Sequence, residues 1–383
     1  MRPATATISR LVAAAHSAPS GENCQPFAYA WDGRRLRVEH VAERARYRLN
    51  AGNHESLLAL GCAVEAIDIA ASVEGLRARF EPLVGLGRDD GPWLAVALEA
   101  GPRDRDDLWR QLSLRTTDRR PFERGDAPGS LLSALQGDTQ RTAGVELGFA
   151  VPVSGALLDY VLRCDHALWT DTQCLRDTAR WVRYSEAEIV SHNDGMRWQN
   201  LGLRRVEAAG GALARRFPAL LDVVGALGGA RQTRRILNQQ VRSAAGLGCY
   251  AVTEVSPGAL VRAGRAAMRG WLRLNQAGYG VQPLALPALG PFNCQAGVSP
   301  ADLPSEVRRL FEEGLGLVRR EFSLGRDVLP VWMYRFGRST QLPVHMRAPR
   351  LPLQKVLRLE VGPSEPTCTP LEDQSEANHG RDS

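Results

Sequence analysis

The chain has 383 residues, a hydrophobic content of 44% and a net charge of +6, so it can bury a large core. On a prior of about 150 residues per domain, this length predicts two or three domains. Runs of about 18 or more apolar residues are missing, which excludes a typical membrane span. The first apolar stretch has only about five residues, too short for a secretory leader. We therefore predict a cytoplasmic protein without a membrane partner.

The cysteine and arginine contents narrow the functional classes further. The seven cysteines show no C-x-x-C spacing, so neither a disulfide framework nor a metal site is predicted. Lys355 is the single lysine among 48 basic residues, a bias that genome composition explains. A solvated surface is the simplest interpretation of these arginines, and phosphate binding by some of them is the alternative. They are spread along the chain with few interleaved aromatic residues, so nucleic acid is not a predicted partner.

A polar loop follows the first apolar helical run, "ISRLVAAA", and precedes alternating, strand-like sequence. The stretch "HSAPSGENCQPFAYAW" concentrates short polar and turn-forming residues: Pro19, Ser20, Gly21, Asn23 and Gln25. An ordinary turn before a strand is the bland interpretation. A plain turn rarely needs two neighbouring amides, however, so we interpret this loop as a candidate binding element.

Two long segments, at 54–76 and 258–281, carry apolar residues at helical spacing. Each is preceded by strand-like sequence. Each is followed by a short strand, "LRARFEP" or "GVQPLAL", and then by a second strand, "PWLAVALEA" or "PVWMYRFG". The order strand, helix, strand, strand thus occurs twice. Coincidence between two α+β segments is one explanation; the other is two similar halves that pack through their long helices.

Arginine clusters mark two further segments. In "RTTDRRPF", Arg115, Thr117 and Arg119 alternate, so they converge on one side of an extended segment or of a first helical turn. Two guanidinium groups with a hydroxyl between them suit a phosphate. Behind the last strand, "RFGRSTQLPVHMRAPRLP" holds four more: Arg335, Arg338, Arg347 and Arg350. Taken singly, each cluster also fits ordinary surface charge.

The order of these clusters resembles that of the nitroreductase-like flavoproteins, in particular the tandem type in which two half-similar domains of one chain imitate the usual homodimer. The motifs that carry the resemblance are "APSGENCQPF", "RTTDR", "GYGVQPLAL" and "MRAPRLPL". Together they cover roughly residues 5–130 and 245–358. The resemblance implies an α+β fold with two related halves, each with a mostly antiparallel sheet and long core helices.

The resemblance also implies a bound FMN at the junction of the halves. The implied cofactor-binding residues are Pro19, Ser20, Gly21, Asn23, Gln25, Arg115, Thr117, Arg119, Gln282, Pro283, Arg347 and Arg350. In this interpretation the arginine motif holds the phosphate, with Arg347 or Arg350 assisting. The early loop meets the flavin ring, whose edge alternates donors and acceptors. Only one complete set of motifs occurs, so one site per chain is expected, with a degenerate counterpart near 222–229.

Three departures from the family pattern bear on this expectation. Phe27 replaces the usual tryptophan of the loop but keeps an apolar anchor. Asp118 puts a carboxylate beside the expected phosphate, which is unfavourable unless Arg115 or Arg120 pairs with it. No acid–base residue is evident, since a lone His16 or Glu22 beside the loop is more often structural. We therefore assign no catalytic residue.

The predicted function is that of an FMN-dependent oxidoreductase, with hydride transfer through flavin N5 and NAD(P)H or a small organic or natural-product molecule as the reactant. Two alternatives stay open: a flavin-binding protein with a covered site and little turnover, and a protein that keeps the fold without flavin. The predicted oligomeric state is a monomeric pseudo-dimer or a homodimer. The predicted segments are a first half (1–103), a linking segment with the arginine motif (104–179), a helical insertion acting as a lid (180–245), a second half (246–360) and a disordered tail (361–383).

Overall fold

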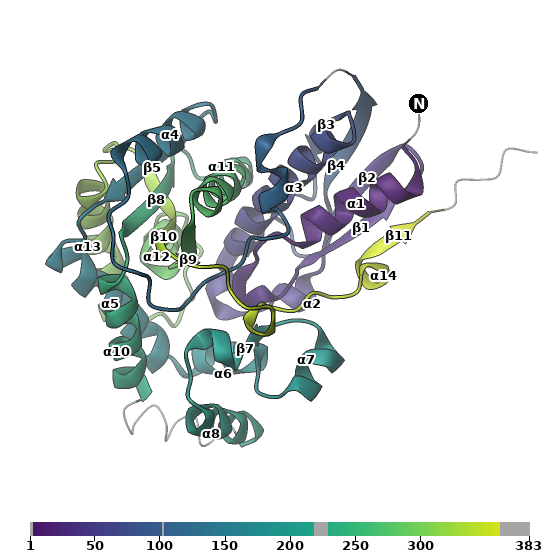
Figure 1. Ribbon diagram of the computed structural model, residues 1–383. Helices are drawn as coiled ribbons and strands as arrows, with labels where there is room; N and C mark the ends of the chain where they lie inside the picture. The colour runs from purple at the N-terminus through teal and green to yellow at the C-terminus, as the bar shows by residue number, and fades with distance from the viewer. Residues whose placement is uncertain (1–2, 102, 218–228, 361–383) are drawn as a thin grey trace, which may run out of the picture.

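The computed structural model describes residues 3–101, 103–217 and 229–360. These residues form an α+β fold, which confirms the predicted class, with one sheet on either side of two central helices (Figure 1). The predicted disordered tail lies outside the described residues. So does the predicted degenerate site at 222–229, apart from Gly229.

The first sheet contains the early strands in the spatial order β1 (Phe27–Trp31), β2 (Arg35–His40), β4 (Gly91–Ala100) and β3 (Leu76–Pro82), all antiparallel. Burial alternates along β2, as expected for a strand with one face on the core. The last strand of the described residues, β11 (Leu357–Leu359), pairs in parallel with the outer edge of β1. The C-terminal segment thereby completes the N-terminal sheet.

The second sheet has the spatial order β5 (Val145–Ala150), β8 (Gly246–Val252), β10 (Leu329–Arg338) and β9 (Tyr279–Pro283), also antiparallel. All seven residues of β8 are buried, because helices cover both faces of the sheet there. Apart from β11, the two sheets share one topology. In each, the strands that come first, second, third and fourth along the chain lie side by side in the spatial order first, second, fourth, third. In both, a long helix follows the second strand.

These two helices, α3 (His54–Val73) and α11 (Pro257–Gln276), pack directly against each other (Figure 1). They touch backbone to backbone at Gly61 and Gly264. A Cβ atom on Gly61 would lie only 2.8 Å from the Cα of Gly264, and one on Gly264 only 3.0 Å from the Cα of Gly61. Glycine is therefore required at the crossing. The stretch 48–73 is long and apolar enough to cross a membrane, but 83% of its apolar window is buried inside the protein, as in a core helix.

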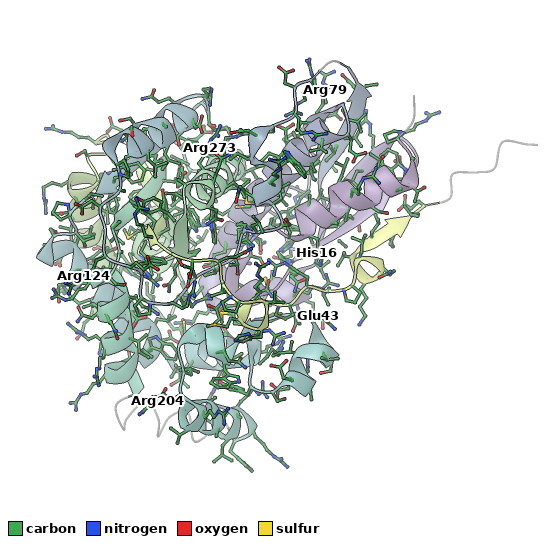
Figure 2. All side chains as sticks on the ribbon, in the orientation of Figure 1. His16, Glu43, Arg79, Arg124, Arg204 and Arg273 are labelled. Atoms are coloured by element: carbon green, nitrogen blue, oxygen red, sulfur yellow. The ribbon has the colours of Figure 1, made fainter. Side chains whose placement is uncertain are left out.

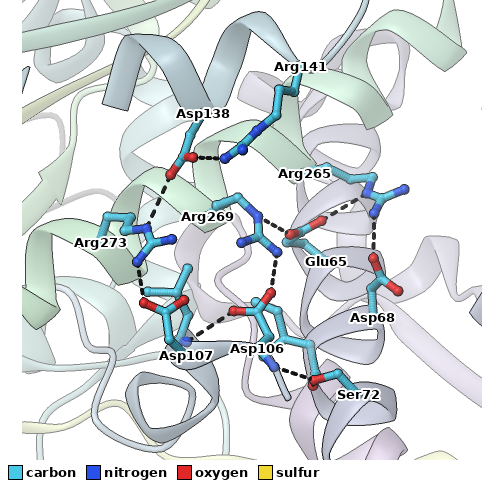
Figure 3. A network of polar contacts seen from close by, with 12 residues as sticks. Glu65, Asp68, Ser72, Asp106, Asp107, Asp138, Arg141, Arg265, Arg269 and Arg273 are labelled. Atoms are coloured by element: carbon cyan, nitrogen blue, oxygen red, sulfur yellow. Dashed lines mark hydrogen bonds and ion pairs between the residues drawn. The ribbon is translucent and has the colours of Figure 1, made fainter. Parts of the chain in front are cut away.

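A chain of ion pairs runs beside the α3–α11 contact (Figure 3). Glu65 of α3 accepts from Arg265 at 3.0 Å and from Arg269 at 2.6 Å, and Arg269 also pairs with Asp106 at 2.7 Å. Arg273 continues the chain to Asp107 and to Asp138 of α4 (Gly129–Gln140). These bonds attach α11 to three separate segments.

Some of the remaining helices cover the sheets, and the others form a separate layer between β5 and β8 in the sequence. The covering helices are α1 (Thr5–His16), α2 (Ala42–Ala45), α12 (Leu286–Gln295), α13 (Ser305–Glu321) and α14 (Leu353–Val356). Between β5 and β8 the chain forms α5 (Gly155–Thr170), α6 (Thr172–Trp181), β6 (Val182–Arg183), α7 (Glu186–His192), β7 (Met196–Arg197), α8 (Arg205–Arg216) and α10 (Gly229–Arg242). This helical excursion, the β5–β8 insertion, begins earlier than the predicted range 180–245. Short 3₁₀ turns occupy 21–23, 48–53, 107–111, 198–201 and 344–346.

Candidate functional site

A cavity of about 1060 Å³ lies between the early loop, the central helices and the β5–β8 insertion. Its wall includes parts of α3, α11, α5, α6 and α10, most of which present apolar side chains. Seven of the twelve predicted site residues line it: Pro19, Ser20, Gly21, Thr117, Arg119, Gln282 and Pro283. Segments nearly two hundred and seventy positions apart in sequence therefore meet at one cavity, and its size is in the range of small-molecule sites.

The arginine motif reaches the cavity because it is attached to the edge of the second sheet. The main-chain N–H of Asp118 donates to the carbonyl of Val281 in β9 at 3.0 Å, and Thr117 forms a parallel bridge with the same residue. The Arg119 guanidinium contacts the sulfur of Met196 at 3.4 Å and forms no ion pair with a described carboxylate. Burial lowers the pKa of Arg119. This side chain thus brings a cation to the cavity wall, where the nearby Glu22 and Asp118 favour its charged form.

The carboxylate of Asp118 is neutralised within its own segment. Arg120 donates to it from Nε at 2.9 Å and from Nη2 at 2.8 Å, and the hydroxyl of Ser339 donates at 2.5 Å. Asp118 is 3% exposed and does not line the cavity. The pairing with Arg120 that the sequence required is confirmed, and this carboxylate does not oppose an anion in the cavity.

Arg115 and Arg350 lie side by side behind the early loop. Both donate to the carbonyl of Ser17, at 2.9 and 3.1 Å, and the Arg115 guanidinium stacks 4.6 Å from the ring centre of Trp271. Nε and Nη1 of Arg115 and Nε of Arg350 are buried without a partner among the described residues. Burial, and then the neighbouring Arg350, lower the pKa of Arg115 to about 9. Two adjacent buried cations with unused donors favour an anionic acceptor.

The two amides of the loop hold other parts of the chain in place. Asn23 donates to the carbonyls of Gly195 and Pro349, both at 2.9 Å, and its oxygen accepts from Arg350. Gln25 donates to Asn193 at 3.1 Å and accepts from the main chain of Leu351 at 2.8 Å. These amides therefore have a structural role: they bind main chain of the insertion and of the C-terminal arm, and neither lines the cavity. Their contact with a flavin stays a prediction.

Backbone strain accompanies these contacts. Three non-glycine residues of the loop adopt left-handed conformations, Glu22 at φ 50°, Asn23 at φ 56° and Gln25 at φ 52°. Such conformations cost energy and concentrate at ligand sites.

Arg347 donates to the carbonyl of Leu342 at 3.3 Å and lies outside the cavity, so the structure does not bring it together with the other predicted residues.

Glu55 lines the cavity and is held by Tyr47, and neither residue was identified from the sequence. Tyr47 donates to Glu55 at 2.6 Å, and both pack so closely on Gly21 that a Cβ atom there would collide with their oxygens. Glu22 lines the cavity beside them. Burial, and then the carboxylate of Glu55, raise the pKa of Glu22 to about 7, while Arg119 acts in the opposite direction. Glu22 was noted beside the loop and set aside as structural, whereas Tyr47 and Glu55 approach Gly21 only through the tertiary fold, so no local spacing reveals their contact.

Replacing Glu22 with glutamine should remove a pH dependence of stability. The carboxyl keeps its proton in the folded state up to about pH 7, whereas the unfolded chain loses it near 4.5. Stability of the native chain should therefore fall as pH rises between these values. Thermal unfolding across this range should show E22Q more stable than the native chain above pH 7 and equal to it at low pH.

Glu43, exposed in the first sheet's covering layer (Figure 2), offers the control E43Q, which should follow the native profile. Parallel profiles for E22Q and the native chain would contradict the assignment.

Comparisons with known proteins add a likeness in structure alone. No family model matches the sequence, and no curated protein matches it. A putative nitroreductase from Anabaena variabilis is similar over 89% of this chain and 90% of its own, with 11% identity and a TM-score of 0.48. A nitroreductase with bound FMN from Desulfitobacterium hafniense covers 64% of this chain and 94% of its own, with 10% identity and a TM-score of 0.34. NfnB from Mycobacterium smegmatis, an FMN-dependent nitroreductase in complex with NADPH, covers 65% and 96%, with 17% identity and a TM-score of 0.33. Likeness at this level assigns neither ligand nor activity to this chain.

Proposed function

We propose that this protein is an FMN-dependent oxidoreductase that acts on a small organic molecule, with NAD(P)H as a candidate electron donor. The observation that carries the proposal is the meeting of the early loop and the arginine motif at one cavity. Pro19, Ser20 and Gly21 line it from one side, and Thr117 and Arg119 from another. These are the residues whose motifs resemble those of the nitroreductase-like flavoproteins.

The charges around the cavity support a phosphorylated ligand. Arg119 lines the cavity and forms no ion pair with a described carboxylate, although the nearby Glu22 favours its charged form. The Arg115–Arg350 pair has unused, buried donors but lies behind the early loop and does not line the cavity. At the cavity wall, Thr117 and Arg119 thus fit the phosphate of FMN and would hold it, while Arg115 and Arg350 would add positive charge from behind the early loop.

FMN, when bound, supplies two-electron hydride chemistry through N5 of its ring. The chain's own residues have simpler tasks. Gln282 brings an amide to the cavity wall, where it favours negative charge on a bound ring. The apolar side chains of α5, α10 and α13, including Val161, Leu237 and Phe311, exclude water from the other end.

We also infer that the chain is an intramolecular pseudo-dimer. The shared strand order of the two sheets supports this, because each has its long helix in the same place. The contact of Gly61 with Gly264 supports it too. In a two-fold arrangement, equivalent residues meet on the axis, and these glycines occupy corresponding helices.

A second candidate function is flavin binding with little turnover. The β5–β8 insertion favours it, because Asn193 and Gly195 bond to the early loop and Met196 touches Arg119. A cover held in this way would hinder a nicotinamide from stacking on the ring. Adding NADPH to the yellow protein separates the two functions: bleaching supports the oxidoreductase, and an unchanged spectrum supports the binding protein.

Replacing Arg119 with alanine is expected to weaken FMN binding by about 1.5–3 kcal/mol, the range for a charge-assisted hydrogen bond. Quenching of flavin fluorescence on titration into the flavin-free protein measures the effect. Arg124 lies in the same segment but is exposed at the outside of the molecule (Figure 2), so R124A is the matched control and should bind FMN as the native chain does.

The purified chain should carry the visible absorbance of a flavin. A colourless protein that fails to bind added FMN would reject the proposed function. Equal FMN affinity in R119A and R124A would mean that Arg119 does not bind the cofactor. The visible spectrum would still decide whether the protein binds flavin.

A further inference from the structure

We propose that Arg335 is a positioning residue that fixes two amides at the cavity wall in opposite senses, Gln282 as a hydrogen-bond donor and Gln240 as an acceptor. Together the two amides would form hydrogen bonds to a ring edge on which a carbonyl group is adjacent to an N–H group. This inference rests on the proposed function, because the pyrimidine edge of FMN carries that pattern.

Arg335 is fully buried in β10 and has no carboxylate partner among the described residues. It donates instead to three segments that meet at the cavity. Nε bonds to the side chain of Gln282 at 2.6 Å, and Nη1 bonds to the main-chain carbonyl of Gln240 at 3.0 Å. Nη2 bonds to the carbonyls of Asp118 and Arg120, at 3.3 and 2.8 Å. The ring of Phe122 covers the guanidinium, with its centre 4.1 Å away.

The bond to Arg335 determines which way the Gln282 amide faces. A guanidinium group has donors only, so it accepts no hydrogen bond and must face the amide oxygen. Gln282 stands directly opposite Arg335 in the β9–β10 ladder and lines the cavity. Its NH₂ group is consequently the polar group that remains for a ligand. With an apolar residue in place of Arg335, nothing would fix this choice, and the amide could turn over.

Gln240, near the end of α10, is held in the reverse sense. Its NH₂ group donates to the carbonyl of Arg119 at 2.6 Å, and a carbonyl only accepts. Gln240 also lines the cavity, and its side-chain oxygen has no partner among the described residues. Arg335 supports this arrangement from both ends, because it binds the main chain of Gln240 and the two carbonyls that flank Arg119.

Donor and acceptor are therefore set by the protein before any ligand binds. The donor of Gln282 suits a ligand carbonyl, and the acceptor of Gln240 suits a ligand N–H. A buried polar pattern of this kind rejects a ligand that lacks the matching group, because one of its own atoms would then stay unpaired. Gln240 comes from the β5–β8 insertion, so the insertion contributes to ligand recognition as well as covering the cavity.

The test compares FMN with 3-methyl-FMN, in which a methyl group replaces the N3 hydrogen. Dissociation constants are measured by fluorescence quenching on the flavin-free full-length chain. The native protein is expected to bind FMN about tenfold more tightly than the analogue, the effect of one hydrogen bond. In Q240L the acceptor is gone, so FMN affinity should fall and the ratio of the two constants should approach one. In Q282L both ligands should weaken together, and the ratio should persist.

Variants of Arg335 test the positioning role. R335K keeps a donor-only group facing Gln282 and should retain the discrimination, whereas R335M should reduce it. If R335M does not fold, Q240L and Q282L decide the question, since their side chains lie at the cavity wall. Equal binding of both flavins by the native chain, or an unchanged ratio in Q240L, would overturn the inference while leaving the proposed function intact. Failure of the native chain to bind FMN at all would reject both.

Discussion

Replacing Glu65 with alanine is expected to lower the free energy of unfolding by about 3 kcal/mol. Glu65 is 4% exposed and accepts from both Arg265 and Arg269 across the α3–α11 contact (Figure 3). Removing it leaves two guanidinium groups without their shared carboxylate in a partly buried position. We place the loss at the lower end of the range for buried pairs, because the two arginine side chains remain 32% and 23% exposed.

Urea unfolding of E65A and of E99A measures this loss against a matched surface pair. Glu99 pairs with Arg79 at 3.2 Å, with both side chains at least half exposed, so E99A should cost less than about 1 kcal/mol. Similar midpoints for the two variants would mean that the network in Figure 3 adds no more than ordinary surface charge.

Replacing Gly264 with alanine is expected to destabilise the protein by about 3 kcal/mol, at the upper end of the range for an overpacked core. The added Cβ would collide with the carbonyl of Leu58 and press on the Cα of Gly61. Both are backbone atoms, so neither can move aside as a flexible side chain could. Relief requires the two helices to separate, and α3 and α11 form the centre of the fold.

The same substitution at Gly258 is the control, because this glycine lies in the same helix. A Cβ atom there meets its nearest neighbour at an ordinary 3.5 Å. Alanine favours helix over glycine by up to about 1 kcal/mol, so G258A should be neutral or stabilising. Opposite shifts of the urea midpoint for G264A and G258A are expected, and equal shifts would show that the helices do not depend on their close approach.

Local patterns predicted the core of this fold because the relevant signals are periodic. Apolar spacing indicated α3 and α11 to within a few residues, since both helices are amphipathic or wholly buried over twenty residues. The four strands that follow them were also indicated. Strand β11 escaped prediction, because three residues that pair in parallel with a distant strand carry no period of their own.

The candidate site was predictable in part. Motif residues such as Ser20, Thr117 and Arg119 do line one cavity. The roles of Asn23 and Gln25 could not be read from the loop, because their partners at 193–195 and 349–351 are contributed by distant segments. Gln240 and Arg335 were missed as a unit for the same reason. Hydrogen-bond direction depends on which groups face each other, and the sequence does not record that.

The placement of β11 has a consequence for synthesis on the ribosome. The first four strands emerge early, yet the strand that covers the outer edge of β1 is translated only after the whole second sheet. Until then that edge offers unpaired N–H and C=O groups to other nascent chains. The apolar helix α3 likewise waits for α11, two hundred residues later. Folding of the first sheet is therefore completed only after the second half has been translated, and until then the growing polypeptide exposes an edge and an apolar helix that favour aggregation.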